Sequence, residues 1–179
     1  MTTTSKITTG LMTAGAVLAL TGCAALMDSE ATAVARLQPT QGNTATGTVL
    51  FTQQGDKVKV DAEVSGLTPG QHGFHVHETG DCSAADGSSA GGHFNPSGKP
   101  HGDPAGTQHH VGDMPMLEAN AGGHASLHVV LDAMTLTKAP GDIIGKAVIV
   151  HQKADDYRTQ PTGNAGGRVA CGVITAQQP

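Results

Sequence analysis

The chain has 179 residues and a formal net charge of -5, with 10 Lys and Arg against 15 Asp and Glu. This length suits one domain of ordinary size. Trp is absent and the aromatic side chains are three Phe and one Tyr, so the chain lacks both the stacking rings and the basic surface of a nucleic-acid binder. Nucleic acid is therefore excluded as a partner, and the informative excess is the 10 His.

The N-terminus has the features of a targeting signal. Residues 11–20 form an apolar run after Lys6, too short to span a bilayer but typical of a signal-peptide core. The run ends in LTGC, which resembles the lipobox of bacterial lipoproteins, where cleavage leaves a lipid-modified cysteine at the new N-terminus. We expect a signal peptide over 1–22, a lipid on Cys23 and a flexible tether over 23–33, placing the protein in the cell envelope or periplasm with no other membrane contact. The alternative is an ordinary secretory signal with an incidental cysteine.

The rest of the chain, 34–179, has the pattern of a single all-β domain. Residues 57–64, KVKVDAEV, alternate between apolar and polar, which predicts a half-buried antiparallel strand. Similar runs between Gly, Pro, Asn and Asp clusters predict seven more strands, near 33–40, 46–53, 70–78, 115–119, 124–131, 146–151 and 169–175. Eight such strands indicate a sandwich or barrel. The two long connections, 79–113 and 152–168, exceed hairpin turns, and loops of that length are commonly functional.

Histidines gather at spacings typical of metal ligands. His75 and His77 are two residues apart, so on a strand both rings project from one face. Further candidates follow in the first long loop and at the end of the apolar run KAVIV: His93, His101, His109, His110, Asp113 and His151. Imidazoles suit copper or zinc, and one carboxylate among them favours a tetrahedral zinc position. The residues alone leave open which of the adjacent His109 and His110 is a ligand.

Five motifs carry a resemblance to a known family. HGFHVHETGDC, GGHFNP, HVGD, GKAVIVHQKADD and GNAGGRVACGVI, in this order over about residues 34 to 176, resemble the successive motifs of the copper/zinc superoxide dismutases. The resemblance implies an eight-stranded antiparallel Greek-key β-barrel or flattened sandwich with one copper and one zinc. It also implies disproportionation of superoxide to dioxygen and hydrogen peroxide as copper alternates between Cu(II) and Cu(I). The alternative is a periplasmic copper-binding or copper-delivery protein on the same fold.

Carried over motif by motif, the resemblance assigns ligands to both metals. The implied copper ligands are His75, His77, His93 and His151. The implied zinc ligands are His93, His101, His110 and Asp113, so that His93 bridges the metals and HVGD selects His110 over His109. Asp155 matches a carboxylate that accepts hydrogen bonds from one ligand of each metal, expected to be His75 and His101, with Asp156 as a rival.

The resemblance also implies the remaining functional residues. Arg168 matches the family's anion-guiding arginine, for which a surface ion pair is the alternative, and His93 is expected to take up and deliver a proton. Cys82 and Cys171 match the family's disulfide once Cys23 is set aside for the lipid. The lipobox and the QPTGNAGGR segment are similar to those of bacterial envelope members. Superoxide is the expected substrate, and the sequence does not decide between a monomer and a homodimer.

Overall fold

The structure is a computed structural model of the chain that describes residues 1–4 and 30–178. The predicted signal core over 11–20 and the predicted lipidation site Cys23 lie outside the described residues. Among the residues described, no helix has the length and apolar character needed to cross a membrane. The first strand begins at Thr32, so the last two residues of the predicted tether belong to it.

The described part of the chain is built from strands, as predicted. They are β1 (Thr32–Pro39), β2 (Thr46–Gln54), β3 (Lys57–Ser65), β4 (Gly70–His72), β5 (Phe74–His77), β6 (Leu117–Ala119), β7 (Ala125–Leu131), β8 (Ala147–His151) and β9 (Arg168–Gln177). The helical element in these residues is a single 3₁₀ turn, η1 (Ser88–Ala90). The all-β prediction is therefore confirmed.

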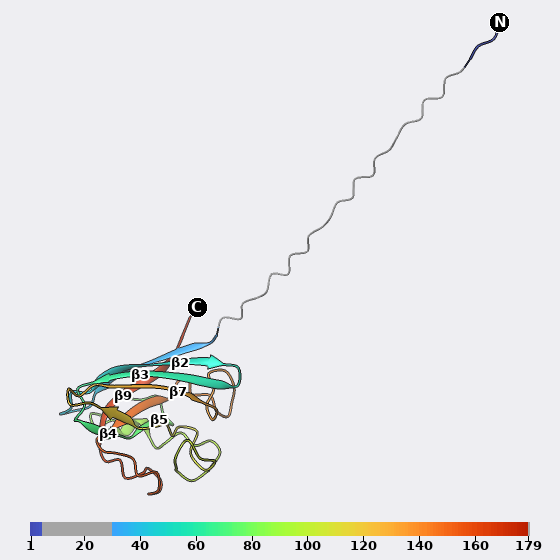
Figure 1. Cartoon of the computed structure of the whole chain (residues 1–179). Helices are drawn as coiled ribbons and strands as arrows, with labels where there is room; N and C mark the ends of the chain where they lie inside the picture. The colour runs from blue at the N-terminus through green and yellow to red at the C-terminus, as the bar shows by residue number, and fades with distance from the viewer. Residues whose placement is uncertain (5–29, 179) are drawn as a thin grey trace.

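The strands form a curled antiparallel sheet and a smaller two-stranded sheet (Figure 1). Seven strands pair in the order β5-β8-β9-β1-β2-β3-β7, and β4 pairs with β6, which lies beside β7. Because β4 leads directly into β5, these pairings run around a single core. The connections from β3 to β4 and from β7 to β8 join strands that are not neighbours, which is the Greek-key arrangement.

The predicted strand over 70–78 is divided at Gly73. The main chain turns at Gly73 from β6 toward β8. The N–H of Gly73 donates to the carbonyl of Lys153, and the carbonyl of Gly73 accepts from the N–H of His151, both at 2.8 Å. A Cβ atom at this position would lie 2.8 Å from the Cβ of Ala165, so only glycine fits. The division lets β4 pair with one neighbour and β5 with another.

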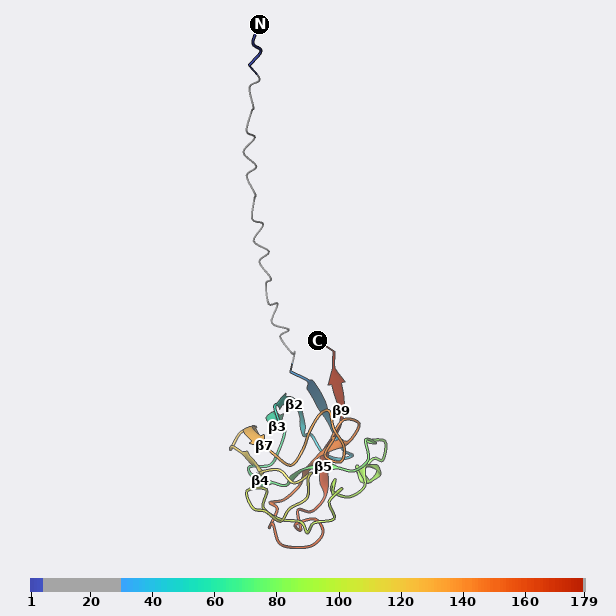
Figure 2. The same ribbon diagram turned by 90° about the vertical axis from the view of Figure 1, so that its right-hand side faces the viewer.

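The predicted alternation places the core correctly. In β3, the apolar face of Val58, Val60, Ala62 and Val64 is buried beneath a polar outer face. The core also encloses Phe51 and other large side chains. Thr32 pairs with Gln177, so both ends of the folded domain leave the barrel together, while the two long loops gather at the other end (Figure 2). The candidate functional residues lie on the loop side.

Candidate metal centre

The predicted copper ligands rest largely on strands. β5 and β8 pair with His75 opposite Ile149 and His77 opposite Ala147, and His151 ends β8. All the side chains of both strands are buried. His93 comes from the first long loop, where an isolated bridge pairs it with His77 at the edge of β5. Paired strands therefore fix three of the four rings, and the loop adds the fourth.

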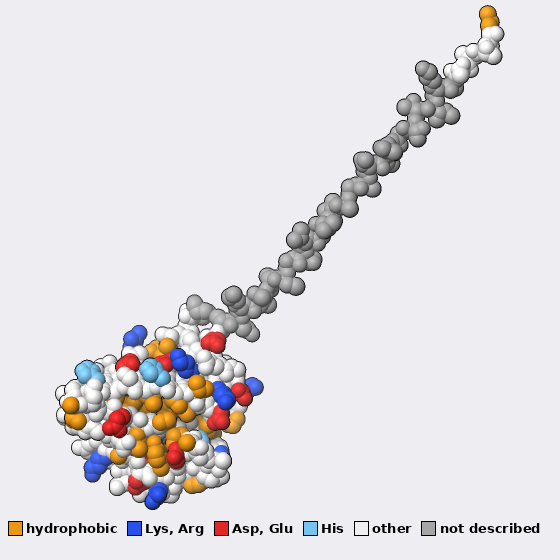
Figure 3. All heavy atoms as spheres, viewed as in Figure 1, with side chains coloured by type: hydrophobic (Ala, Val, Ile, Leu, Met, Phe, Trp, Pro, Cys, Tyr) orange, Lys and Arg blue, Asp and Glu red, His pale blue; other side chains and the backbone are white. Residues whose placement is uncertain are grey.

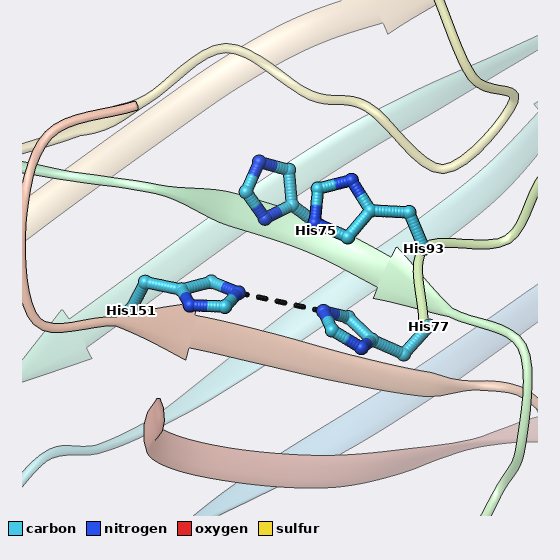
Figure 4. Close-up of side chains that lie close together, drawn as sticks. All are labelled: His75, His77, His93 and His151. Carbon is cyan, nitrogen blue, oxygen red and sulfur yellow. Dashed lines mark hydrogen bonds between the residues drawn. The ribbon is translucent and has the colours of Figure 1, made fainter. Parts of the chain in front are cut away.

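The four rings converge as expected for ligands of one ion (Figure 4). Their candidate ligand atoms all lie within 4.8 Å of one another. His77 Nδ1 donates to the carbonyl of Gly91 at 2.9 Å, and His151 Nδ1 donates to that of Gly166 at 3.2 Å. In neutral rings this leaves both Nε2 atoms unprotonated, and they face each other at 3.4 Å. Two facing lone pairs fit a cation between them.

The predicted zinc ligands converge on one carboxylate oxygen. Asp113 Oδ1 lies 3.0 Å from both His93 Nδ1 and His101 Nδ1, and 3.6 Å from His110 Nδ1. The other oxygen, Oδ2, accepts backbone N–H groups of His110 at 2.8 Å and Gly102 at 3.2 Å. The backbone thus turns Oδ1 toward three imidazole nitrogens, the donor set of a tetrahedral zinc site.

Three buried ring nitrogens identify where the ions would bind. His75 Nδ1, His93 Nε2 and His110 Nδ1 have no hydrogen-bond partner among the described residues. A buried polar atom without a partner is costly, and nearly all such atoms in proteins are paired. Two of these nitrogens belong to the copper cluster and one to the zinc cluster. Copper and zinc would satisfy all three, so the residues present fit both metals.

Asp155 connects the two clusters from behind. Its Oδ2 accepts from His75 Nε2 at 2.6 Å, and its Oδ1 accepts from His101 Nε2 at 2.9 Å. These bonds place a proton on the Nε2 of each ring, so Nδ1 is the atom of each ring that a metal would bind. Asp156, the rival position, is exposed and accepts from Thr159 instead. The contacts expected for Asp155 are present.

Burial and charge set the protonation of the rings. Burial lowers the pKa of His75 to about 4 and that of His151 to about 3, so both are neutral near pH 7 and offer lone pairs. Burial alone would also lower the pKa of His101, but its hydrogen bonds to Asp113 and Asp155 raise that pKa to about 9. A metal bound at His101 must therefore displace a proton.

The register of the HVGD motif is resolved by geometry. The His110 ring lies in the zinc cluster, whereas His109 Nδ1 donates to the main-chain carbonyl of His110 at 2.7 Å. His72, three residues before the copper pair, lies outside both clusters and contacts the main-chain carbonyl of His151 through Nδ1 at 2.7 Å. Both extra histidines support the backbone of a ligand.

Sequence reasoning missed the residues that hold Asp155. The N–H of Tyr157 donates to Asp155 Oδ1 at 2.7 Å, and the N–H of Asp155 donates to the thioether sulfur of Met116 at 3.2 Å. Gly163, with φ +66°, lies so close that a Cβ atom there would be 1.8 Å from Asp155 Oδ1 and 2.6 Å from His101 Nε2. The GNAGG motif marked this glycine, but its spacing gave no sign of the close approach.

Arg168 begins β9 opposite His151. Its guanidinium donates to the carbonyls of Gly87 at 2.6 Å and Gly91 at 2.5 Å. The Gly91 carbonyl also accepts from His77 Nδ1, so one oxygen joins the arginine to a predicted copper ligand. Arg168 is partly exposed and lines a surface hollow. The arginine is therefore fixed beside the copper cluster with access to solvent.

The predicted disulfide is present. Cys82 and Cys171 are bonded across a sequence separation of 89 residues, with their Cα atoms 5.8 Å apart. Cys82 belongs to the first long loop and Cys171 to β9, three residues after Arg168. The bond attaches the loop that supplies the Gly87 and Gly91 carbonyls to the strand that carries the arginine.

Comparisons with known proteins agree with this geometry. Residues 45–174 match the sequence model of the family described as copper/zinc superoxide dismutase (SODC). The extracellular superoxide dismutase [Cu-Zn] of Brugia pahangi is 43% identical over 153 residues, covering 80% of this chain and 75% of that protein. A crystal structure of the clock protein EA4 is similar with a TM-score of 0.74 and 44% identity, covering 82% of this chain and 95% of that one. With both ligand sets in place, this chain belongs to the copper/zinc superoxide dismutase family.

Proposed function

We propose that this protein is a superoxide dismutase of the cell envelope in which Arg168 binds the anion and His93 handles a proton. Two superoxide anions and two protons give one dioxygen and one hydrogen peroxide. The observation that carries the proposal is His93, a single buried ring whose Nδ1 faces the zinc cluster while Nε2 is left without a partner beside the copper cluster. When bound, copper supplies one-electron oxidation and reduction, and zinc supplies a fixed positive charge.

Arg168 suits the binding of a small monoanion. A guanidinium carries five N–H donors, of which the carbonyls of Gly87 and Gly91 take two and hold the group still. The free donors and the permanent charge remain for superoxide. Asp86 lines the surface hollow beside Arg168, and its negative charge reduces the positive potential there. The arginine thus orients the anion beside the copper ligands without itself binding a metal.

His93 suits the delivery of a proton. Its Nδ1 is engaged on the side of Asp113, so Nε2 is the atom that can take up a proton and release it to the reduced substrate. Asp155 holds His75 and His101 in their tautomers and keeps their outward nitrogens occupied. This division of roles leaves His93 as the proton-carrying ring.

The test is metal analysis combined with a superoxide-consumption assay on the protein loaded with copper and zinc. We expect one copper and one zinc per chain, an electron paramagnetic resonance spectrum typical of tetragonal Cu(II) with four nitrogen ligands, and rapid superoxide decay. Zinc in both positions after copper loading would contradict the proposal. Full metal loading with negligible turnover would favour a copper-delivery protein instead.

We place the protein in the cell envelope, with residues 1–22 as a signal peptide, a lipid on Cys23, a tether over 23–33 and the enzyme domain over 34–179. The lipobox-like LTGC and the disulfide Cys82–Cys171 support a compartment where thiols oxidise. The relative from Brugia pahangi is described as extracellular. Cys23→Ser should release active protein from membranes, and mass spectrometry of the native N-terminus should find the acyl groups. An unmodified Cys23 would refute the anchor.

We further propose that two copies form a homodimer. Hydrophobic side chains gather in the middle of one face, with charges of both signs around them (Figure 3). Leu127, Val129 and Leu131 of β7 and the loop residue Val111 pack against the core yet remain partly exposed. A stable dimer needs about 800 Å² from each copy. Analytical ultracentrifugation at micromolar concentration should give twice the monomer mass, and a monomer there would end the proposal.

A further inference from the structure

His101 and His110 are the two predicted metal ligands that neither a strand nor an isolated bridge attaches to the sheet. The strands β5 and β8 carry three of the copper ligands, and isolated bridges attach Asp113 and His93 to β5. His101 lies in an irregular stretch of the first long loop and is only 3% exposed. Buried main-chain N–H and C=O groups need hydrogen-bond partners, and at His101 no strand supplies them.

The side chain of Gln160, in the second long loop, supplies both partners. Its Oε1 accepts the main-chain N–H of His101 at 2.8 Å, and its Nε2 donates to the His101 carbonyl at 2.9 Å. The second Nε2 hydrogen is directed to the carbonyl of Arg158 at 3.2 Å. Turning the amide over would set oxygen against two carbonyls, so these three contacts fix its orientation. The carboxamide takes the place of a neighbouring strand.

We propose that Gln160 is a positioning residue for zinc, because it holds the main chain of the ligand His101. Asp155 holds the ring of the same ligand from the same loop, at His101 Nε2. The second long loop therefore forms hydrogen bonds with the His101 ring and with its main-chain N–H and carbonyl. Contacts of this kind to a metal ligand typically change metal affinity by about 10-fold to 100-fold. The inference rests on the proposed zinc site.

The test is the rate at which zinc leaves the copper- and zinc-loaded protein in the presence of a chromogenic chelator. Gln160→Met keeps the length of the side chain but removes its donor and acceptor, and Gln160→Ala is a second variant with less bulk to accommodate. Gln71→Met, the same substitution at an exposed glutamine of β4, is the matched control. We expect zinc release about tenfold faster in both Gln160 variants, with copper release and the control within twofold of the unaltered protein.

Cobalt(II) in the zinc position gives a second reading, because its visible absorption reports ligand geometry. We expect the cobalt bands of Gln160→Met to shift relative to those of the unaltered protein and Gln71→Met. Unchanged zinc release and cobalt bands would refute the inference. So would copper and zinc leaving faster by the same factor, since that indicates general loosening. Absence of zinc from the unaltered protein would instead refute the zinc site of the proposed function.

Discussion

The copper and zinc halves of the centre are built in different ways. His75, His77 and His151 project from β5 and β8, two buried strands joined by main-chain hydrogen bonds. Apart from His93, the zinc ligands lie on an irregular loop: His101, His110 and Asp113. There, hydrogen bonds to side chains replace the main-chain hydrogen bonds between strands. The positions of the copper ligands should therefore depend on the stability of the barrel. The positions of the zinc ligands should depend on a few contacts between loops, so changes to these contacts should lower zinc affinity more than copper affinity.

Removing the disulfide should have the largest effect, because it ties the first loop to β9. Closing a loop of this length contributes about 4 to 5 kcal/mol in the chain-entropy model, a factor of about a thousand in the unfolding equilibrium. The double variant Cys82→Ser/Cys171→Ser should show this loss in denaturant unfolding of the metal-free protein. Its β-sheet circular dichroism in native buffer should persist. A loss below about 1 kcal/mol would show that other contacts already hold the loop.

Gly163→Ala should come next, since the new methyl group would meet both Asp155 and His101. Zinc affinity should fall by about a hundredfold, measured by chelator competition. Gly55→Ala is the matched control, because Gly55 has a similar φ of +61° but nothing within 4 Å of the added carbon. Equal zinc affinity in the two variants would mean that the close approach of Gly163 to Asp155 and His101 does not matter for zinc binding.

Asp155→Asn separates the two halves directly. The amide keeps one acceptor oxygen and loses the other, so one of the two ring hydrogen bonds must fail. His75 remains held by β5, whereas His101 depends on the second loop. Zinc affinity should fall by about 10-fold to 100-fold and copper affinity by less than tenfold. Parallel titrations with both metals measure the two losses of affinity. A larger loss for copper than for zinc would contradict the proposed difference between the two halves.

Arg168→Gln should have the smallest effect on metals and a clear effect on rate. No metal ligand changes, and the Gly91 carbonyl still accepts from His77. Superoxide decay should slow by about tenfold, because a charge-assisted hydrogen bond contributes about 1.5 to 3 kcal/mol. The difference from the unaltered enzyme should narrow as salt screens the charge, and Arg168→Lys should restore part of the rate. Equal rates at low salt would remove Arg168 from the mechanism.

The same contrast explains what the sequence could predict. Alternation in strands is local, so it located nearly all the strands and placed His75 and His77 on one face. The resemblance supplied the ligand sets, His110 and the disulfide, because those motifs have fixed spacing. Neither source could find Gln160, whose partner His101 is 59 residues away in a loop without periodicity. The break at Gly73 was missed because it depends on Lys153 and Ala165, which approach only in three dimensions.

The pairing of Thr32 with Gln177 also makes the folded domain easy to attach to a surface. Arg168 begins β9 and Gln177 ends it nine residues later, a span of about 30 Å. Both ends of the described domain leave at the pole away from the metal ligands (Figure 2). A bead, an electrode or a fused protein joined at either terminus would therefore leave the copper side facing the solution. The two termini are equivalent attachment points for building an immobilised form of this enzyme.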